Sequence, residues 1–137
     1  QYVGSELLDF SKNVIIENGG DNFIKTEHDA HISVYAGSSP LSEKIILKLN
    51  SSSMPAGICT SSGTIGHSLS FGRADAVCVL SDSAVLADAA ATAIGNQVRN
   101  KNDLRKAMEW GMDIDGIRGV VIILGGTMGL LGDIELA

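Results

Sequence analysis

The segment Ala84 to Ile94, with the sequence AVLADAAATAI, constrains the fold more than any other part of this chain. Apolar residues occur on almost every side of it at the helical period. The pattern therefore predicts a helix that belongs in a core rather than on a surface. Ser81 or Asp82 is the expected N-cap, and Gly95 with Asn96 is expected to end the helix.

A polar stripe interrupts this helix. Thr92 and Asn96 follow Asp88 at intervals of four residues, so the three side chains project from one helical face. A buried carboxylate without a partner is strongly destabilising, so a stripe inside a core requires a cation, a metal ion or a set of donors. The alternative is a solvated edge of an amphipathic helix, which is an ordinary pattern. The spacing alone leaves both interpretations open.

The loop from Thr60 to Ser68, TSSGTIGHS, contains five hydroxyl side chains and two glycines. Such a composition is typical of loops whose successive backbone N–H groups bind a phosphate or a diphosphate. A plain turn between two strands is the alternative. A serine nucleophile needs a positioned base, and a histidine this close in sequence does not establish that geometry, so we do not predict a hydrolase. The candidate ligand-binding residues are Thr60, Ser61, Ser62, Gly63, Thr64, Gly66 and His67.

The other elements are predicted from alternation and turn residues. The segments 13–17 and 22–26 are expected to pair as a hairpin around Asn18, Gly19 and Gly20. A second helix is expected from Asn102 or Asp103 to about Trp110. The remaining expected strands are 31–36, 44–49, 56–60, 76–80 and 119–124.

The C-terminal strand at 134–136 is expected to pair with 119–124 across a connection at 127–132. Strands of this kind with helices grouped together predict an α+β fold, in which a mostly antiparallel sheet packs against helices.

Composition excludes two functional classes. The formal net charge of −6 and the isoelectric point of about 4.8 argue against a nucleic-acid-binding protein, which normally has a basic face. No stretch approaches the roughly 18 apolar residues of a membrane span. Cys59 and Cys78 lie in apolar runs and are expected to be buried, and they match neither a disulfide framework nor a zinc pattern. This cysteine usage predicts a cytoplasmic location.

Two segments carry a resemblance to a known family. The run AGICTSSGTIGHSLSFGRADAV at 56–77 and ADAAATAIGN at 87–96 resemble an uncharacterised protein family related to ApbE, a flavin transferase. ENGGD at 17–21, YAGSSPLS at 35–42 and RGVVIILGGTMGLLGDIEL at 118–136 extend the match over essentially the whole chain. The resemblance implies an ApbE-like domain with a T-fold-like arrangement.

The resemblance also implies a ligand. In ApbE relatives an Asp, and a Thr four residues later, bind Mg²⁺, which holds the pyrophosphate of FAD, and this pair corresponds to Asp88 and Thr92. The family's ATSG strand end corresponds to Cys59, Thr60, Ser61 and either Ser62 or Gly63, with Cys59 replacing the usual alanine. His67 corresponds to the histidine of the following family motif and is the candidate catalytic residue.

The chain departs from that motif after His67, because the sequence Ser68-Leu-Ser-Phe-Gly lacks the Asp-Pro pair and the Thr found in the relatives. Two functions therefore remain open. The first is an enzyme that binds a flavin nucleotide or another phosphorylated small molecule with a divalent cation, with transferase activity. The second is a non-catalytic ligand-binding or assembly protein with the same fold.

The resemblance bears on domain organisation as well. ApbE relatives are longer than 137 residues, and residues 1–12 read like the end of a helix that is already under way. We therefore expect a single domain that lacks its N-terminal half. The missing strands would come from an upstream segment or from another copy of the chain, as a homo-oligomer.

Overall fold

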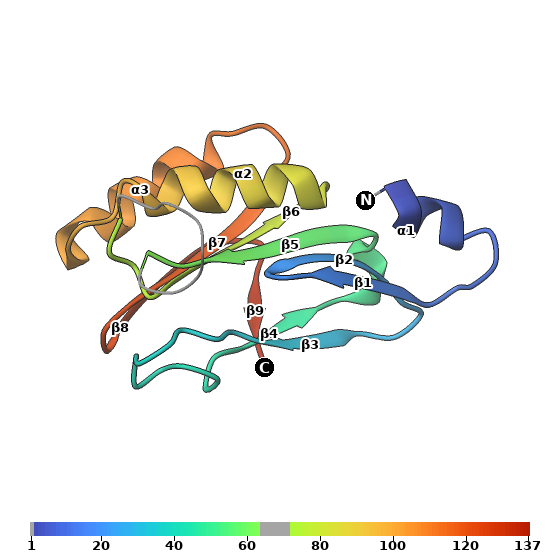
Figure 1. The fold of residues 1–137 in the computed structure, drawn as a ribbon, viewed down its shortest axis with the longest axis horizontal. Helices are drawn as coiled ribbons and strands as arrows, with labels where there is room; N and C mark the ends of the chain where they lie inside the picture. The colour runs from blue at the N-terminus through green and yellow to red at the C-terminus, as the bar shows by residue number, and fades with distance from the viewer. Residues whose placement is uncertain (1, 64–71) are drawn as a thin grey trace.

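The computed structural model describes residues 2–63 and 72–137, which form three layers (Figure 1). Helices α2 and α3 cover one face of a six-stranded sheet, and a three-stranded sheet covers the other face (Figure 1). The helices are α1 (Tyr2–Leu7), α2 (Ala84–Gly95) and α3 (Leu104–Met112). The large sheet has the order β1 (Val14–Asn18), β2 (Asp21–Lys25), β5 (Ala56–Ser61), β6 (Ala76–Ser81), β7 (Ile117–Leu124) and β8 (Thr127–Gly132). The small sheet has the order β3 (Ala30–Ser33), β4 (Ile46–Leu49) and β9 (Glu135–Leu136).

The paired strands of both sheets are antiparallel, so the predicted α+β class with a mostly antiparallel sheet is confirmed. The β1–β2 hairpin lies within one residue of its predicted position. Strands β3 and β4 are shorter than predicted. Among the described residues, no helix is both long enough and apolar enough to cross a membrane.

The large sheet separates two apolar cores because strand residues alternate between its faces. In β6, Val77 and Val79 pack under the helices, whereas Cys78 and Leu80 pack against the small sheet. Every residue of β6 is buried. This explains the continuous apolar run in the sequence, because a strand covered on both faces has no solvent-facing side for polar residues.

Helix α2 begins at Ala84, two residues after Asp82, which was one of the two predicted N-caps. Ser81 is the last residue of β6 and is buried, and its Oγ accepts a hydrogen bond from the backbone N–H of Ser83 at 3.1 Å. Ser83 is the N-cap, because its hydroxyl accepts from the N–H of Leu86 at 3.4 Å. The predicted caps were therefore wrong, since the strand continues through Ser81. The predicted end at Gly95 and Asn96 is confirmed.

The prediction that α2 is surrounded by core was also wrong. One side of the helix packs on the sheet through Ala87, Ala91 and Ile94, while Val85 on the other side is 70% exposed. The alanines follow from a close approach between helix and sheet rather than from burial on all sides. Gly57 of β5 lies directly beneath the first turn of α2.

Replacing Gly57 by alanine is expected to lower the free energy of unfolding by about 1–3 kcal/mol, the usual cost of overpacking. The added Cβ would overlap backbone atoms of Ser83 and Ala84, which cannot rotate away. Urea denaturation followed by circular dichroism measures the effect. Gly126→Ala is a matched control, since its Cβ would meet only the Pro40 side chain at 3.9 Å. Equal stability of the two variants would contradict this account of the packing.

The C-terminal strand pairing differs from the prediction. The segment Thr127–Gly132 is not a connection but strand β8, which forms a hairpin with β7 around Gly125 and Gly126. Gly125 adopts a positive φ of 59°, which suits this tight turn. Strand β9 then pairs with β4 in the small sheet and not with β7. The glycines of β8 read as loop residues in the sequence, and this caused the error.

The second helix also differs slightly from the prediction. A 3₁₀ turn, Lys101–Asp103, precedes α3, which runs from Leu104 to Met112. Asn100 and Asp103 cap the 3₁₀ turn through reciprocal side-chain contacts. The predicted start at Asn102 or Asp103 therefore falls within this 3₁₀ turn, one or two residues before the α-helix itself.

Candidate functional site

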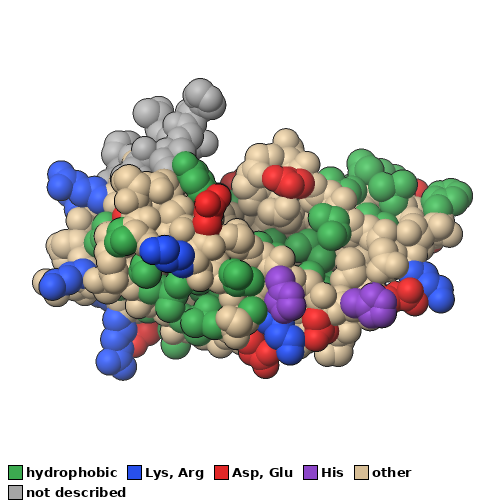
Figure 2. Space-filling model, turned by 90° about the horizontal axis from the view of Figure 1, so that it is seen from below, with side chains coloured by type: hydrophobic (Ala, Val, Ile, Leu, Met, Phe, Trp, Pro, Cys, Tyr) green, Lys and Arg blue, Asp and Glu red, His purple; other side chains and the backbone are tan. Residues whose placement is uncertain are grey.

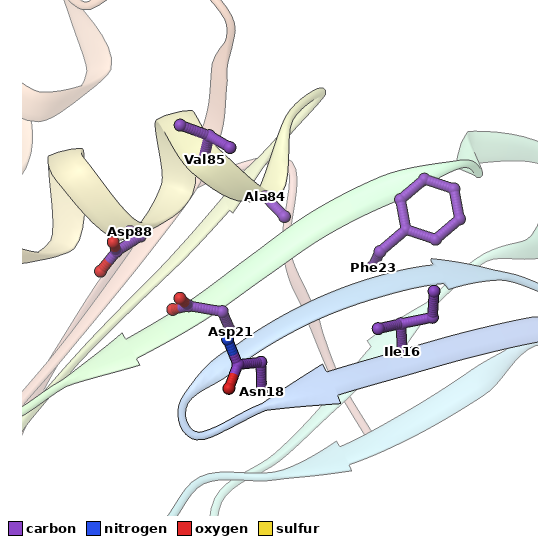
Figure 3. Close-up of a pocket in the computed structure, with 7 residues that line it drawn as sticks. All are labelled: Ile16, Asn18, Asp21, Phe23, Ala84, Val85 and Asp88. Atoms are coloured by element: carbon purple, nitrogen blue, oxygen red, sulfur yellow. The ribbon is translucent and has the colours of Figure 1, made fainter. Parts of the chain in front are cut away.

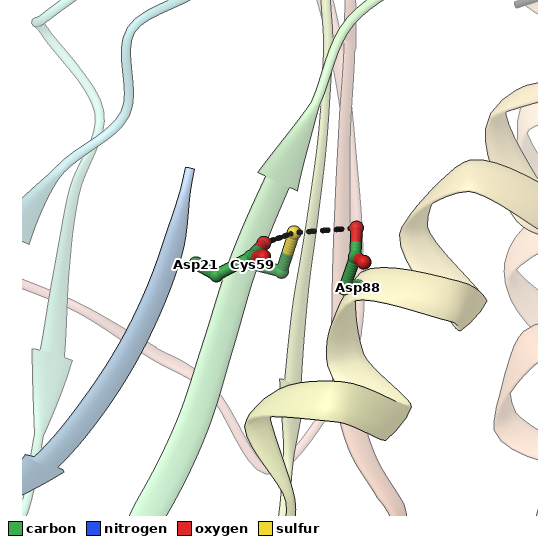
Figure 4. Close-up of side chains that lie close together, drawn as sticks. All are labelled: Asp21, Cys59 and Asp88. Atoms are coloured by element: carbon green, nitrogen blue, oxygen red, sulfur yellow. Dashed lines mark hydrogen bonds between the residues drawn. The ribbon is translucent and has the colours of Figure 1, made fainter. Parts of the chain in front are cut away.

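Three side chains from three different elements meet beside the middle of α2 (Figure 4). Asp21 comes from the start of β2, Cys59 from β5, and Asp88 from the second turn of α2. The Sγ atom of Cys59 lies 2.7 Å from Oδ1 of Asp21 and 3.7 Å from Oδ1 of Asp88. The three potential ligand atoms lie within 4.8 Å of one another. We call this group the Asp-Cys-Asp cluster.

Strand register brings the cluster together. Asp21 and Cys59 are opposite residues in the β2–β5 pair, so their side chains leave the sheet on the same face. Cys59 belongs to the core beneath the helices, which identifies that face as the helical one. Asp88 completes the cluster because α2 lies over β5. The sequence separates these residues by 29 and 38 positions, so only the fold brings them together.

The Cys59 thiol is protonated in this environment. Burial raises the pKa of this thiol well above its ordinary range, and the hydrogen bond to Asp21 and the two nearby carboxylates raise it further. The thiol therefore donates its hydrogen bond mainly to Asp21. The distance to Asp88 is longer because the thiol has a single proton for two carboxylates. Within residues 2–63 and 72–137, no Lys, Arg or His forms an ion pair with either carboxylate.

A cleft of about 210 Å³ opens beside the cluster (Figure 3). Asp21 and Asp88 face each other at one end of it, and Ile16 and Phe23 lie farther along the strands (Figure 3). The described residues that line this cleft include two carboxylates and no basic side chain. They are Ile16, Asn18, Asp21, Phe23, Ala84, Val85 and Asp88. An anion alone would be repelled here, whereas a cation would be attracted.

A second hollow, of about 350 Å³, lies at the same end of the six-stranded sheet but on its opposite face. Its lining includes Thr60 and Ser62 from the predicted ligand loop. The alternation of β5 places Thr60 on the face opposite Cys59, where it forms a hydrogen bond with the Cys78 thiol. Burial nevertheless raises the pKa of Cys78 to about 11. The other lining residues are Glu17, Gly19, Gly20, Asn22, Ile32, Ser33 and Tyr35.

The face on the side of the small sheet carries charges of both signs. Figure 2 shows basic and acidic side chains interspersed there, without a continuous basic area. Lys48 forms ion pairs with Asp29 and Glu135 at 3.7 and 3.8 Å.

The predicted loop residues have different surroundings. Thr60 donates its backbone N–H to Gly20, at 3.1 Å, and Gly63 donates its N–H to Ala74, at 2.9 Å. These two N–H groups are satisfied within the fold and are therefore not free for a phosphate. Ser61 is the last residue of β5. Thr64, Gly66 and His67 lie outside the described residues.

On α2, Thr92 lies one helical turn after Asp88 and is half-buried, whereas Asp88 is exposed. The Asp88 carboxylate is therefore open to solvent and also reaches the Asp-Cys-Asp cluster. Of the two interpretations of the polar stripe, a solvated helix edge and a partnered carboxylate, each describes part of this arrangement. The sequence analysis missed Asp21 and Cys59 as partners of Asp88. A signal existed in the segment ENGGD, where a carboxylate directly follows a glycine turn, but only the glycines were considered.

Several known proteins are similar to this chain. The model of the family described as "AbpE bacteria" matches residues 1–135. A UPF0280 protein of Methanococcus aeolicus is 47% identical over 127 residues, covering 90% of this chain and 51% of the relative. A UPF0280 protein of Methanococcus maripaludis is 49% identical with the same coverage, and one of Methanocaldococcus jannaschii is 40% identical over 129 residues, covering 90% of this chain and 53% of the relative. The chain spans about half the length of these curated relatives. The chain belongs to this uncharacterised ApbE-related family.

Proposed function

We propose that this chain supplies the cation-binding part of a protein that binds a flavin nucleotide or another phosphorylated small molecule. The observation that carries the proposal is the convergence of Asp21 and Asp88 at one end of the cleft. Two carboxylates without a basic partner among the described residues attract a divalent cation. A cation held there would in turn attract the phosphate groups of a ligand that the bare cleft would repel.

The oxygen atoms present fit Mg²⁺, the ion that the family resemblance implies. Mg²⁺ prefers carboxylate oxygens and commonly completes its coordination with water and substrate phosphates. Asp88 and Asp21 would supply the charged oxygens, and Thr92, one turn along the same face of α2, would supply a neutral one. Bound there, the ion would neutralise the phosphate charge of the ligand.

The size of the cleft limits what this chain binds alone. Ligand pockets usually enclose about 300–1,000 Å³, and the cleft has about 210 Å³. It therefore accommodates the phosphates and adjoining atoms rather than a whole dinucleotide. The relatives, which are about twice as long, have further sequence that can surround the rest of the ligand.

A non-catalytic binding protein is the second candidate function. It is favoured by the sequence after His67, where the Asp-Pro pair and the Thr of the family motif are missing. Incubation with FAD, Mg²⁺ and an acceptor peptide that contains Thr or Ser separates the two candidates, because transfer of FMN to the acceptor hydroxyl breaks the pyrophosphate bond of FAD and releases AMP. Binding without AMP release would support the non-catalytic alternative.

The proposed function is tested by calorimetric titration of the full-length protein with FAD and with riboflavin. Riboflavin lacks the phosphates and is the matched control ligand. We expect FAD to bind only when Mg²⁺ is present, and riboflavin to bind weakly in either condition. Equal affinity for the two ligands, or FAD binding that a chelator leaves unchanged, would disprove the cation-mediated mode.

A further inference from the structure

We infer that Cys59 is a direct ligand of the cation held by Asp21 and Asp88, so that this centre favours a thiophilic divalent ion such as Zn²⁺ over Mg²⁺. The inference rests on the proposed function, because it identifies a third ligand of the same cation. It concerns a mixed set of two carboxylates and one thiol, contributed by β2, β5 and α2.

The distances suit a shared ion. With a Zn–S distance of about 2.3 Å and a Zn–O distance of about 2.0 Å, tetrahedral ligands lie about 3.5 Å apart. The separation between Cys59 Sγ and Asp88 Oδ1 is 3.7 Å, close to that value. The separation between Cys59 Sγ and Asp21 Oδ1 is 2.7 Å and must widen by less than an ångström. Rotation of the Asp21 side chain, which is half-buried beside the open cleft, provides this movement.

The two buried cysteines have different surroundings, and apolar packing alone does not account for those of Cys59. Cys78 is fully buried in the core between the two sheets. Cys59 is only 2% exposed, yet its sulfur is directed at two carboxylates beside a cleft. These carboxylates have no basic partner among the described residues, so their mutual repulsion is relieved by a bound cation.

The donor set determines the preference among ions. Thiolate ligands favour Zn²⁺ and similar ions, whereas Mg²⁺ is held almost entirely by oxygen. Three protein ligands leave a fourth tetrahedral position for water or for a ligand phosphate, as in zinc sites that remain open to substrate. On binding, the Cys59 thiol gives up its proton to solvent and the thiolate enters the coordination sphere. The cleft beside Asp21 and Asp88 provides the path to the open position.

Cobalt(II) tests the inference without any measurement of activity. The full-length protein is freed of metal with a chelator and titrated with Co²⁺ under absorption spectroscopy. We expect a thiolate-to-cobalt charge-transfer band in the near ultraviolet, which oxygen ligands do not produce. Zn²⁺ should remove the band at stoichiometric concentration, and Mg²⁺ in large excess should leave it.

Variants assign the band to one residue. Cys59→Ala should abolish it and weaken Co²⁺ binding by about a hundredfold or more, since even groups that only hydrogen-bond to a metal ligand contribute about 10- to 100-fold. Cys78→Ala is the matched control, because it removes the other buried thiol from the opposite face of the sheet, and it should retain the band. Circular dichroism verifies that both variants are folded.

The possible outcomes separate the two proposals. Co²⁺ binding without a charge-transfer band in the unmodified protein overturns the role of Cys59 and leaves an oxygen-only cation site, as in the proposed function. A band that persists in Cys59→Ala also overturns the inference. No binding of Co²⁺, Zn²⁺ or Mg²⁺ in the absence or presence of a nucleotide overturns both.

Discussion

Replacing Asp88 by alanine is expected to weaken cation-dependent nucleotide binding by about a hundredfold or more, which corresponds to about 2.8 kcal/mol. Among the described residues, Asp88 is one of two carboxylates that line the cleft, so its loss removes half of the negative charge that they contribute there. Calorimetric titration with ADP at saturating Mg²⁺ or Zn²⁺ measures the change. Because Asp88 is exposed and belongs to neither apolar core, the variant should fold normally.

Two further variants sharpen this prediction. Asp115→Asn removes the same charge from an exposed position outside the cleft lining and should leave the affinity within about twofold, because a carboxylate outside the cleft does not contact the cation. Thr92→Val should weaken binding less than Asp88→Ala, because one neutral ligand is lost rather than a charge. Equal binding by Asp88→Ala and the unmodified protein would remove the proposed site.

The fold was predictable from the sequence where local pattern and tertiary context agree. The buried strand β6 and helix α2 follow directly from a continuous apolar run and an alanine-rich periodic segment. The β1–β2 hairpin follows from two glycines between alternating strands. Strand β8 was missed because Gly129 and Gly132 weaken the pattern, although Gly129 is required for close packing against Met108.

The candidate site was only partly predictable. The helix spacing identifies Asp88 and Thr92 as neighbours, since that relation is local. Asp21 and Cys59 reach Asp88 only through the antiparallel register of β2 with β5, and a one-residue change of register would move them to the other face. The sequence analysis also treated Thr60 as part of the same site as Asp88. The pleat of β5 places Thr60 on the opposite face, which no composition argument could show.

The surface around α1 bears on domain organisation. Among the described residues, several large apolar side chains are exposed here and on the neighbouring edge strand β1, namely Tyr2, Val3, Leu7, Phe10 and Ile15. Phe10 is 87% exposed and Tyr2 is 77% exposed. Within the described chain, β1 has β2 on one side only, whereas β7 lies between β6 and β8. Additional strands from elsewhere can therefore join this sheet at its two edges, β1 and β8, but not at β7.

The 137-residue chain alone is accordingly expected to self-associate. Exposed apolar patches and unpaired strand edges promote association between molecules, and the relatives have about as much additional sequence that can cover them. Sedimentation velocity at increasing concentration measures the effect, and we expect the average mass of the isolated chain to rise steadily above 14.3 kDa.

Substitutions locate the responsible surface. Ile15→Lys together with Phe10→Ser should shift the isolated chain toward the monomer, because a charge on an edge strand opposes edge-to-edge pairing. Trp110→Ser is the matched control, since Trp110 is a large apolar side chain that is 43% exposed on α3, away from β1. This control should associate as the unmodified chain does. A compact monomer with cooperative unfolding in the unmodified chain would instead show that these residues form a complete domain, and the expectation of a missing N-terminal half would then be wrong.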